Sequence, residues 1–313
     1  MTYQVTVNQH PKGAVILLEN TDTQCKVEVF SFGAILNKFI IPINGVDRNV
    51  VDGFENIADA VENITNGFKS AFLSPFPCRM KNGIYTHEEV DYKVAKFYLQ
   101  PHAIHGIVYD LRYDVVETVA TDEMAKLTLS AKYTGTDEGY PFEYAIEHSF
   151  ILKEAATLSL SSTITNNGKA SIPYAQGWHP YFSVANTVDE CTLQFSSFEK
   201  VVFDDTLIPT GEIALEEKFY PGTSLKDIEL DNCYILDEEH QYRCTLQGID
   251  LALHIFPDES YGYIQVYTPP HRKSIAIENL SGAPDCFNNG LGLQIVHPNE
   301  QASFVTNYQL EVL

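Results

Sequence analysis

Residues 157–164, Thr-Leu-Ser-Leu-Ser-Ser-Thr-Ile, decide the fold class of this chain. Apolar residues alternate there with hydroxyl-bearing ones, and Asn166-Asn167-Gly168 follows as a turn signal. A period of two places the apolar side chains on one face of a strand, and a turn directly after it favours an antiparallel neighbour. The stretch therefore predicts a half-buried strand of an antiparallel sheet.

Similar strand signals recur from one end of the chain to the other. They cover residues 14–19, 26–30, 126–133, 200–203, 251–256, 263–267 and 274–280, with turn signals at Asn44-Gly45, Lys81-Asn82-Gly83 and Asn289-Gly290. One segment has helical spacing, with apolar residues at 54, 57, 60, 61 and 64 before Asn66-Gly67. We therefore predict an all-β protein, a large antiparallel β-sandwich with one or two short helices and a single domain over residues 1–313. The pattern alone does not distinguish a sandwich from a barrel.

The charge of the chain argues against several classes of partner. Its 42 acidic and 20 basic residues give a formal net charge of −22. A nucleic-acid-binding protein needs a basic surface to neutralise phosphates, and anionic lipid surfaces would repel this chain as well. We expect no nucleic-acid or membrane partner, and a monomer or weak homodimer.

The cysteines indicate a reducing environment. Six are scattered without a Cys-x-x-Cys pair, and the polar first ten residues lack the features of a secretory leader. No apolar run approaches the about 18 residues that a membrane-spanning helix needs. We therefore expect free thiols and a cytoplasmic location.

A carboxylate interrupts the apolar strand at residues 274–280. Strand alternation places Ala276, Glu278 and Leu280 on one face. If that face is buried, the pKa of Glu278 rises toward the range of a general base, whereas a solvent-facing glutamate is the common alternative.

Two further segments carry histidines. His179 follows the only tryptophan, Trp178, in an aromatic run of the kind that packs against sugar rings, although an aromatic core is the common alternative. His102 and His105 have a spacing that zinc sites use, but neither a His-Glu-x-x-His helix nor a cysteine pair accompanies them, so we expect no metal and treat a loop histidine pair as the common alternative. Arg79 and Asp231 are candidate partners for sugar hydroxyls, with a surface arginine and a turn aspartate as the alternatives.

The order of these pieces resembles the aldose 1-epimerase (galactose mutarotase) family over nearly the full length. The matching segments are Arg79 before Asn82-Gly83-Ile84-Tyr85, His105-Gly106, Gly139-Tyr140-Pro141, His179-Pro180-Tyr181-Phe182, Asp231, and Tyr267-Thr268 leading to Glu278 and Pro284-Asp285. Departures at Trp178, Asn232 and Leu280, where the family usually has Asn, His and Gln, indicate a divergent bacterial-type branch.

The resemblance implies a galactose mutarotase-like supersandwich that interconverts the α and β anomers of a free hexose. Glu278 would be the base, His179 the acid, and His105 a hydrogen-bond partner of the ring oxygen, while Arg79, Asp231 and Trp178 would bind the sugar. No cofactor is needed, because only protons move. Three alternatives stay open. They are a hexose-phosphate 1-epimerase using Arg79, Lys81, Arg272 and Lys273; a sugar-binding protein without catalysis; and a glycosidase using Asp231 and Glu278.

Overall fold

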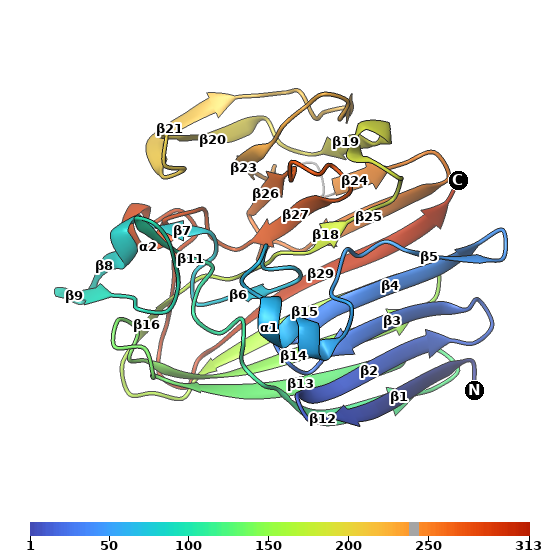
Figure 1. Ribbon diagram of the computed structural model, residues 1–313. Helices are drawn as coiled ribbons and strands as arrows, with labels where there is room; N and C mark the ends of the chain where they lie inside the picture. Colours follow the sequence, from blue (N-terminus) through green and yellow to red (C-terminus); the bar gives the residue numbers. More distant parts are fainter. Residues whose placement is uncertain (238–243) are drawn as a thin grey trace.

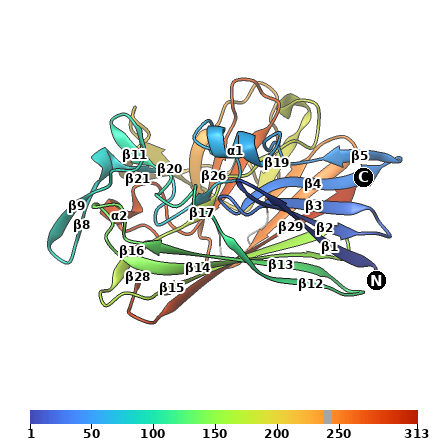
Figure 2. The same ribbon diagram turned by 60° about the horizontal axis from the view of Figure 1, so that its bottom comes forward.

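Two antiparallel sheets face each other across the main hydrophobic core (Figures 1 and 2). The computed structural model describes residues 1–237 and 244–313. The smaller sheet has the order β1 (Tyr3–His10), β2 (Gly13–Asn20), β3 (Cys25–Phe30), β4 (Ile35–Ile43) and β5 (Val46–Asn49). Its strands β1 and β2 contact strands β12 to β14 of the larger sheet, which confirms the predicted sandwich.

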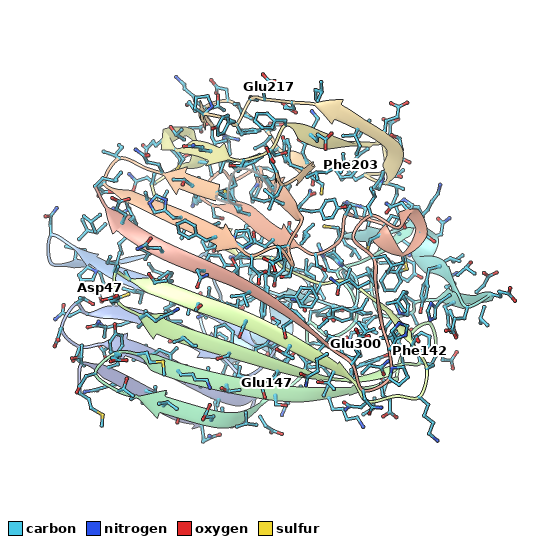
Figure 3. All side chains as sticks on the ribbon, turned by 180° about the vertical axis from the view of Figure 1, so that it is seen from behind. Asp47, Phe142, Glu147, Phe203, Glu217 and Glu300 are labelled. Carbon is cyan, nitrogen blue, oxygen red and sulfur yellow. The ribbon has the colours of Figure 1, made fainter. Side chains whose placement is uncertain are left out.

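The larger sheet has nine strands and contains the segment that predicts the fold. Its order is β12 (Asp114–Ala120), β13 (Ala125–Thr134), β14 (Glu143–Lys153), β15 (Thr157–Asn166), β29 (Gln301–Val312), β25 (Leu251–Pro257), β24 (Cys244–Gln247), β19 (Thr192–Phe195) and β22 (Thr223–Ser224). Along β15 every second side chain is buried, as the alternation predicts. On its neighbour β14, Glu147 lies on the outer face, whereas Ile146 and His148 are buried (Figure 3).

A third sheet of eight strands lies beside the sandwich and carries most of the candidate site (Figure 1). Its order is β21 (Pro209–Leu215), β20 (Glu199–Phe203), β23 (Asp231–Ile235), β26 (Tyr263–Tyr267), β27 (Ile275–Leu280), β17 (Gly177–Trp178) and β6 (Phe72–Leu73), with β18 (Tyr181–Phe182) also paired to β27. The smaller groups are β10 (Tyr98–Leu99), β11 (His102–Ile104) and β7 (Arg79–Met80); β8 (Ile84–His87) and β9 (Val90–Lys93); and β16 (Ile172–Tyr174) and β28 (Gln294–Val296).

Within the described ranges the α-helices are two short segments, α1 (Ile57–Asn63) and α2 (Cys286–Asn289). The Asn56 side chain accepts hydrogen bonds from the backbone N–H groups of Ala58 and Asp59, which starts α1 at Ile57. The predicted helix is therefore correct in place but too long. Phe54 lies outside it because its N–H donates to the Asn37 side chain at 2.7 Å.

The cysteines and the helices match what the sequence predicts of them. All six cysteines are buried free thiols, as their scattered spacing predicts. Among the described residues, no helix has the length and apolar character that spanning a membrane requires.

Candidate functional site

A cavity of about 380 Å³ lies against the eight-stranded sheet. This volume is within the usual range for small-molecule sites. Its wall is made by Thr65, Asn66, Gly67, Phe68, Cys78, Arg79, Leu99, Ile104, His105, His179, Tyr181, Phe203, Leu207, Asp231, Gln265, Tyr267, Glu278 and Pro284. The wall includes five of the six predicted site residues, although they come from distant parts of the sequence.

Strand pairing places a row of polar side chains on the floor of the cavity. Gln265 on β26 lies directly between Cys233 on β23 and Glu278 on β27. Asp231 and Tyr267 form the next row on the same face, because alternate residues of a strand point the same way. The sheet register therefore collects carboxyl, amide and phenol groups from three strands into one site.

Glu278 is the most enclosed carboxyl group of the cavity. Every residue of β27 is buried, and Glu278 is 2% exposed, so the solvent-facing alternative is wrong. Burial raises the pKa of Glu278 well above its ordinary value, the nearby Asp231 charge adds to that rise, and the Arg79 charge opposes it. A raised pKa makes the carboxylate a stronger base than a hydrated glutamate, which suits a group that takes a proton from a substrate.

His179 is the direct partner of Glu278. Its Nε2 lies 3.3 Å from Glu278 Oε1, and its ring stacks on Tyr181 with a centroid separation of 5.0 Å. The backbone of His179 donates to Ala71 and accepts from Ser70, which fixes it between β17 and β18. Burial lowers the pKa of His179 to about 4. In the free protein, burial thus favours the uncharged form of both partners, and one proton suffices for the pair.

His105 reaches the cavity through an unusual backbone conformation. His105 and Cys78 both have positive φ values, of 62° and 51°, and the His105 N–H donates to the Cys78 carbonyl at 2.9 Å. Gly106, at φ 70°, has no room for a side chain, because a Cβ there would lie 2.2 Å from the Ser74 carbonyl oxygen. Non-glycine residues in this region carry strain of about 1–3 kcal/mol each and concentrate at functional sites.

The His105 ring lies beside the His179 ring in the cavity wall. Its centroid lies 4.9 Å from that of His179 and 4.7 Å from that of Phe68. Burial lowers the pKa of His105 well below its ordinary value, and the charges of His179 and Arg79 add to that effect. A neutral imidazole in this position can donate a hydrogen bond from one nitrogen and accept one at the other.

Arg79 and Asp231 supply opposite charges to the cavity. Asp231 accepts a hydrogen bond from Gln265 Nε2 at 2.7 Å. Burial raises the pKa of Asp231, while the Arg79 charge and the Gln265 hydrogen bond oppose the rise. Arg79 lies in β7, paired with Ile104 of β11, and its carbonyl accepts from the Asp285 N–H at 2.7 Å. The pair offers a hydroxyl-rich ligand both acceptors and donors.

Several buried polar atoms of the site lack a partner among the described residues. They are Glu278 Oε2, Gln265 Oε1, His179 Nδ1 and His105 Nδ1. Buried polar groups are otherwise nearly always hydrogen-bonded, so such a concentration in one cavity indicates a polar ligand.

The structure corrects the prediction that Trp178 binds the substrate. Its indole is 2% exposed and packs in the core, with ring centroids of Phe72 and His148 both at 4.9 Å. The reason is strand alternation. Trp178 and His179 are adjacent in an extended segment, so when His179 faces the cavity Trp178 faces the opposite side.

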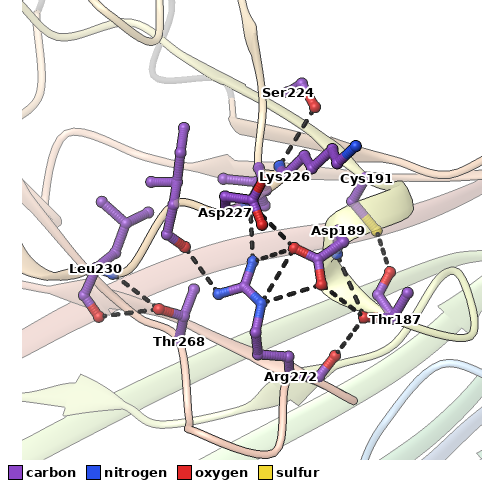
Figure 4. Close-up of polar contacts among 11 residues, drawn as sticks. Thr187, Asp189, Cys191, Ser224, Lys226, Asp227, Leu230, Thr268 and Arg272 are labelled. Carbon is purple, nitrogen blue, oxygen red and sulfur yellow. Dashed lines mark hydrogen bonds and ion pairs between the residues drawn. The ribbon is translucent and has the colours of Figure 1, made fainter.

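The basic residues required by the phosphate alternative do not converge. Of the four candidates, Arg79 lines the cavity, whereas Lys81, Arg272 and Lys273 do not. Arg272 Nη2 instead contacts Asp189 at 2.7 Å and donates to the Leu225 carbonyl at 2.8 Å (Figure 4). This ion pair lowers the pKa of Asp189 to about 2. Arg272 therefore connects the segment at Asp189 to the segment at Leu225.

The two histidines with zinc-like spacing, His102 and His105, do not face the same site. His102 Nδ1 accepts from the Asn82 N–H at 3.0 Å and His102 lies outside the cavity wall, whereas His105 lies in it.

Three parts of the cavity wall are not predicted from the sequence: Gln265, Cys78 and the loop at residues 65–68. Gln265 could have been found from Tyr267, since both fall on one strand face, but nothing local marks the loop.

The fold and the cavity define an all-β protein with a buried carboxyl–imidazole pair in a polar small-molecule site. The sequence pattern of the family described as aldose 1-epimerase matches residues 14–309, so the chain belongs to the aldose 1-epimerase family. The Uncharacterized protein YihR of Escherichia coli (strain K12) is 26% identical over 231 residues, which cover 72% of this chain and 73% of YihR.

Solved structures show the same fold. A galactose mutarotase-like protein from Clostridium acetobutylicum superposes with a TM-score of 0.86 at 16% identity, over 100% of this chain and 99% of its own. Galactose 1-epimerase from Lactobacillus acidophilus NCFM gives 0.85 at 16% identity, with 99% and 98% covered. The GalM/aldose epimerase homologue from C. elegans gives 0.82 at 19% identity, with 99% of each chain covered. At these identities the likeness is one of fold.

Proposed function

We propose that this protein is an aldose 1-epimerase that interconverts the α and β anomers of a free, uncharged hexose. The observation that carries the proposal is the buried contact between Glu278 and His179, 3.3 Å apart, within a cavity that also contains His105, Arg79 and Asp231. Anomer exchange needs a base at the C1 hydroxyl and an acid at the ring oxygen, and a carboxyl–imidazole pair supplies both.

The reaction can be written with balanced protons. In ring opening, the Glu278 carboxylate takes the proton of the C1 hydroxyl, the bond between C1 and the ring oxygen breaks, and protonated His179 gives its proton to that oxygen. The aldehyde turns about the C1–C2 bond. In closure, His179 takes the proton back from the attacking hydroxyl while Glu278 returns one to O1, so no proton is consumed.

The directions of the two pKa changes are consistent with this cycle. Burial favours protonated Glu278 and neutral His179, and that is the proton distribution of the open-chain stage. The free protein favours the same distribution, so a proton moves from Glu278 to His179 across their 3.3 Å contact before the ring opens, and the pair returns to its uncharged form in the open-chain stage. In this proposal His105 hydrogen-bonds the ring oxygen, and Arg79 and Asp231 bind the sugar hydroxyls.

The site favours a neutral sugar over a sugar phosphate. Arg79 is accompanied in the wall by the carboxyl groups of Asp231 and Glu278, and a phosphate would need further basic groups. The Glu278–His179 contact favours catalysis over binding alone, since binding requires no matched acid and base. A glycosidase would use Asp231 and Glu278, which also share the cavity wall, but its mechanism would leave the buried Glu278–His179 contact without a role.

Polarimetry tests the proposal. Freshly dissolved α-D-glucose and α-D-galactose are followed with wild-type protein, with Glu278→Gln and with Glu311→Gln. Glu311 is the matched control, because it also contacts a histidine, at 2.8 Å, but is 60% exposed and lies outside the cavity. We expect acceleration by wild type and Glu311→Gln that Glu278→Gln loses. Equal turnover by both variants would contradict the assignment.

A further inference from the structure

A second chemical feature of the cavity is a cluster of three metal-binding side-chain types. One ligand atom each from Cys78, His105 and Glu278 lies within 4.8 Å of the other two, and all three side chains are buried. Cys78 directly precedes β7, His105 directly follows β11, and Glu278 lies in β27. Three separate segments therefore bring a thiol, an imidazole and a carboxyl group to one point.

Two of these side chains have spare ligand atoms. His105 Nδ1 and Glu278 Oε2 are buried without a hydrogen-bond partner in the part of the chain that the structure describes. Thiolate, imidazole and carboxylate are the donors that zinc uses, at about 2.0–2.3 Å, so a tetrahedral site would require the ligand atoms to approach one another by only about 1 Å. All three residues line the cavity, which leaves the fourth position open to it.

We propose that Cys78, His105 and Glu278 form a binding site for a thiophilic divalent cation such as Zn²⁺, and that the bound ion excludes the sugar. A thiolate ligand selects zinc over magnesium or calcium, which prefer several oxygen ligands. Ion binding would release the thiol proton and hold Glu278 as the carboxylate. With Asp231 and Arg79 also in the wall, one divalent cation then balances the charges of the site.

The ion and the sugar compete because they need the same groups. Glu278 and His105 are both assigned to the reaction under the proposed function, so the bound ion would act as a reversible inhibitor. The binding of the ion itself does not depend on that function. Cys78 has no role in the proton transfers, which makes it the residue that separates the two activities.

The first test uses Co²⁺ as a spectroscopic probe and Zn²⁺ in calorimetric titrations of the full chain. We expect one ion per chain and a cobalt–thiolate charge-transfer absorption that added Zn²⁺ removes. Cys78→Ser should lose this absorption and weaken Zn²⁺ binding by more than roughly 100-fold, the upper end of the effect of losing a residue that only orients a metal ligand. Cys191→Ser is the matched control, a buried free thiol outside the cavity, and should bind as wild type does.

The second test measures mutarotation with added Zn²⁺. Wild type should be inhibited competitively with sugar, whereas added Zn²⁺ should leave the rate of Cys78→Ser, measured against its own metal-free rate, unchanged. Absence of a thiolate absorption in wild type overturns the metal site even if Cys78→Ser does not fold, and so does Zn²⁺ binding that Cys78→Ser leaves unchanged. If wild type binds Zn²⁺ but turns over no sugar, the proposed function fails and the metal site stands.

Discussion

Two carboxyl–imidazole pairs among the residues that the structure describes have different surroundings. His254 Nε2 lies 2.8 Å from Glu311 Oε2 on neighbouring strands β25 and β29, whereas His179 Nε2 lies 3.3 Å from Glu278 Oε1 in the cavity. The side chains of His254 and Glu311 are 8% and 60% exposed, and those of His179 and Glu278 are 6% and 2% exposed. The shorter contact is thus the one whose carboxylate remains in water.

This difference shows that contact distance does not identify a proton-transfer pair. A hydrated carboxylate keeps its solvation, and an exposed ion pair contributes at most about 1 kcal/mol. The Glu278 side chain is 2% exposed, so its charged form depends on His179, Arg79 and a bound ligand. Because its carboxyl group is buried, the Glu278–His179 pair can change its protonation when a substrate binds, whereas the exposed pair cannot be changed in this way.

The largest expected effect separates the two histidines. His179→Asn should reduce mutarotation by about 10²–10⁴-fold, because it removes the group that transfers a proton at the ring oxygen. His254→Asn, the same change in the peripheral pair, should leave the rate near that of wild type. Polarimetry with the preferred sugar measures both, and comparable losses in the two variants would contradict the distinction.

The next prediction concerns stability above the ordinary carboxyl pKa. Since the folded protein binds the Glu278 proton up to a raised pKa, it holds more protons than the unfolded chain in that window, and wild-type stability falls as pH rises through it. Glu278→Gln should remove this fall and be the more stable protein at pH 8, by about 1.4 kcal/mol for each pH unit that separates the folded from the unfolded pKa. The difference in stability between Glu278→Gln and wild type should shrink toward pH 4.

Urea unfolding of wild type, Glu278→Gln and Glu311→Gln at several pH values provides the measurement. Glu311→Gln alters a hydrated side chain, so its free energy of unfolding should stay within about 0.5 kcal/mol of wild type. A Glu278→Gln protein that is less stable than wild type at pH 8 would show that the ionised carboxylate is well compensated in the fold.

Below neutral pH, His179 makes the stability of the protein depend on pH in the opposite direction. Burial lowers its pKa from 6.5 to about 4, so between these values the unfolded chain binds more protons and stability falls as pH falls. In His179→Asn, the free energy of unfolding should change less between pH 6.5 and pH 4 than it does in wild type, by a few kcal/mol. Unfolding midpoints from pH 7 to pH 4 test this, and an unchanged slope in His179→Asn would argue against a buried neutral imidazole.

The smallest expected effect is at Asp231. Asp231 is assigned to sugar hydroxyls and bonds to Gln265 at 2.7 Å. Asp231→Asn keeps the shape of the side chain but removes its charge, so we expect KM to rise by about 10-fold, equivalent to about 1.4 kcal/mol, with a smaller change in kcat. Full initial-rate curves separate the two constants. A fall in kcat as large as that of His179→Asn would place Asp231 among the proton-transfer groups.

The sequence by itself determines the all-β class, because the alternation of apolar and polar side chains along a strand is local and can be read directly from residues 157–164. It also indicates the motif residues Glu278, His179, His105, Arg79 and Asp231, because their order resembles a known family. The tertiary structure alone decides their surroundings. It shows that Glu278 is buried, that Trp178 faces the core, and that Arg272 is bound to Asp189. Burial and side-chain partners depend on which distant segments pack together, and strand register across β23, β26 and β27 fixes that arrangement.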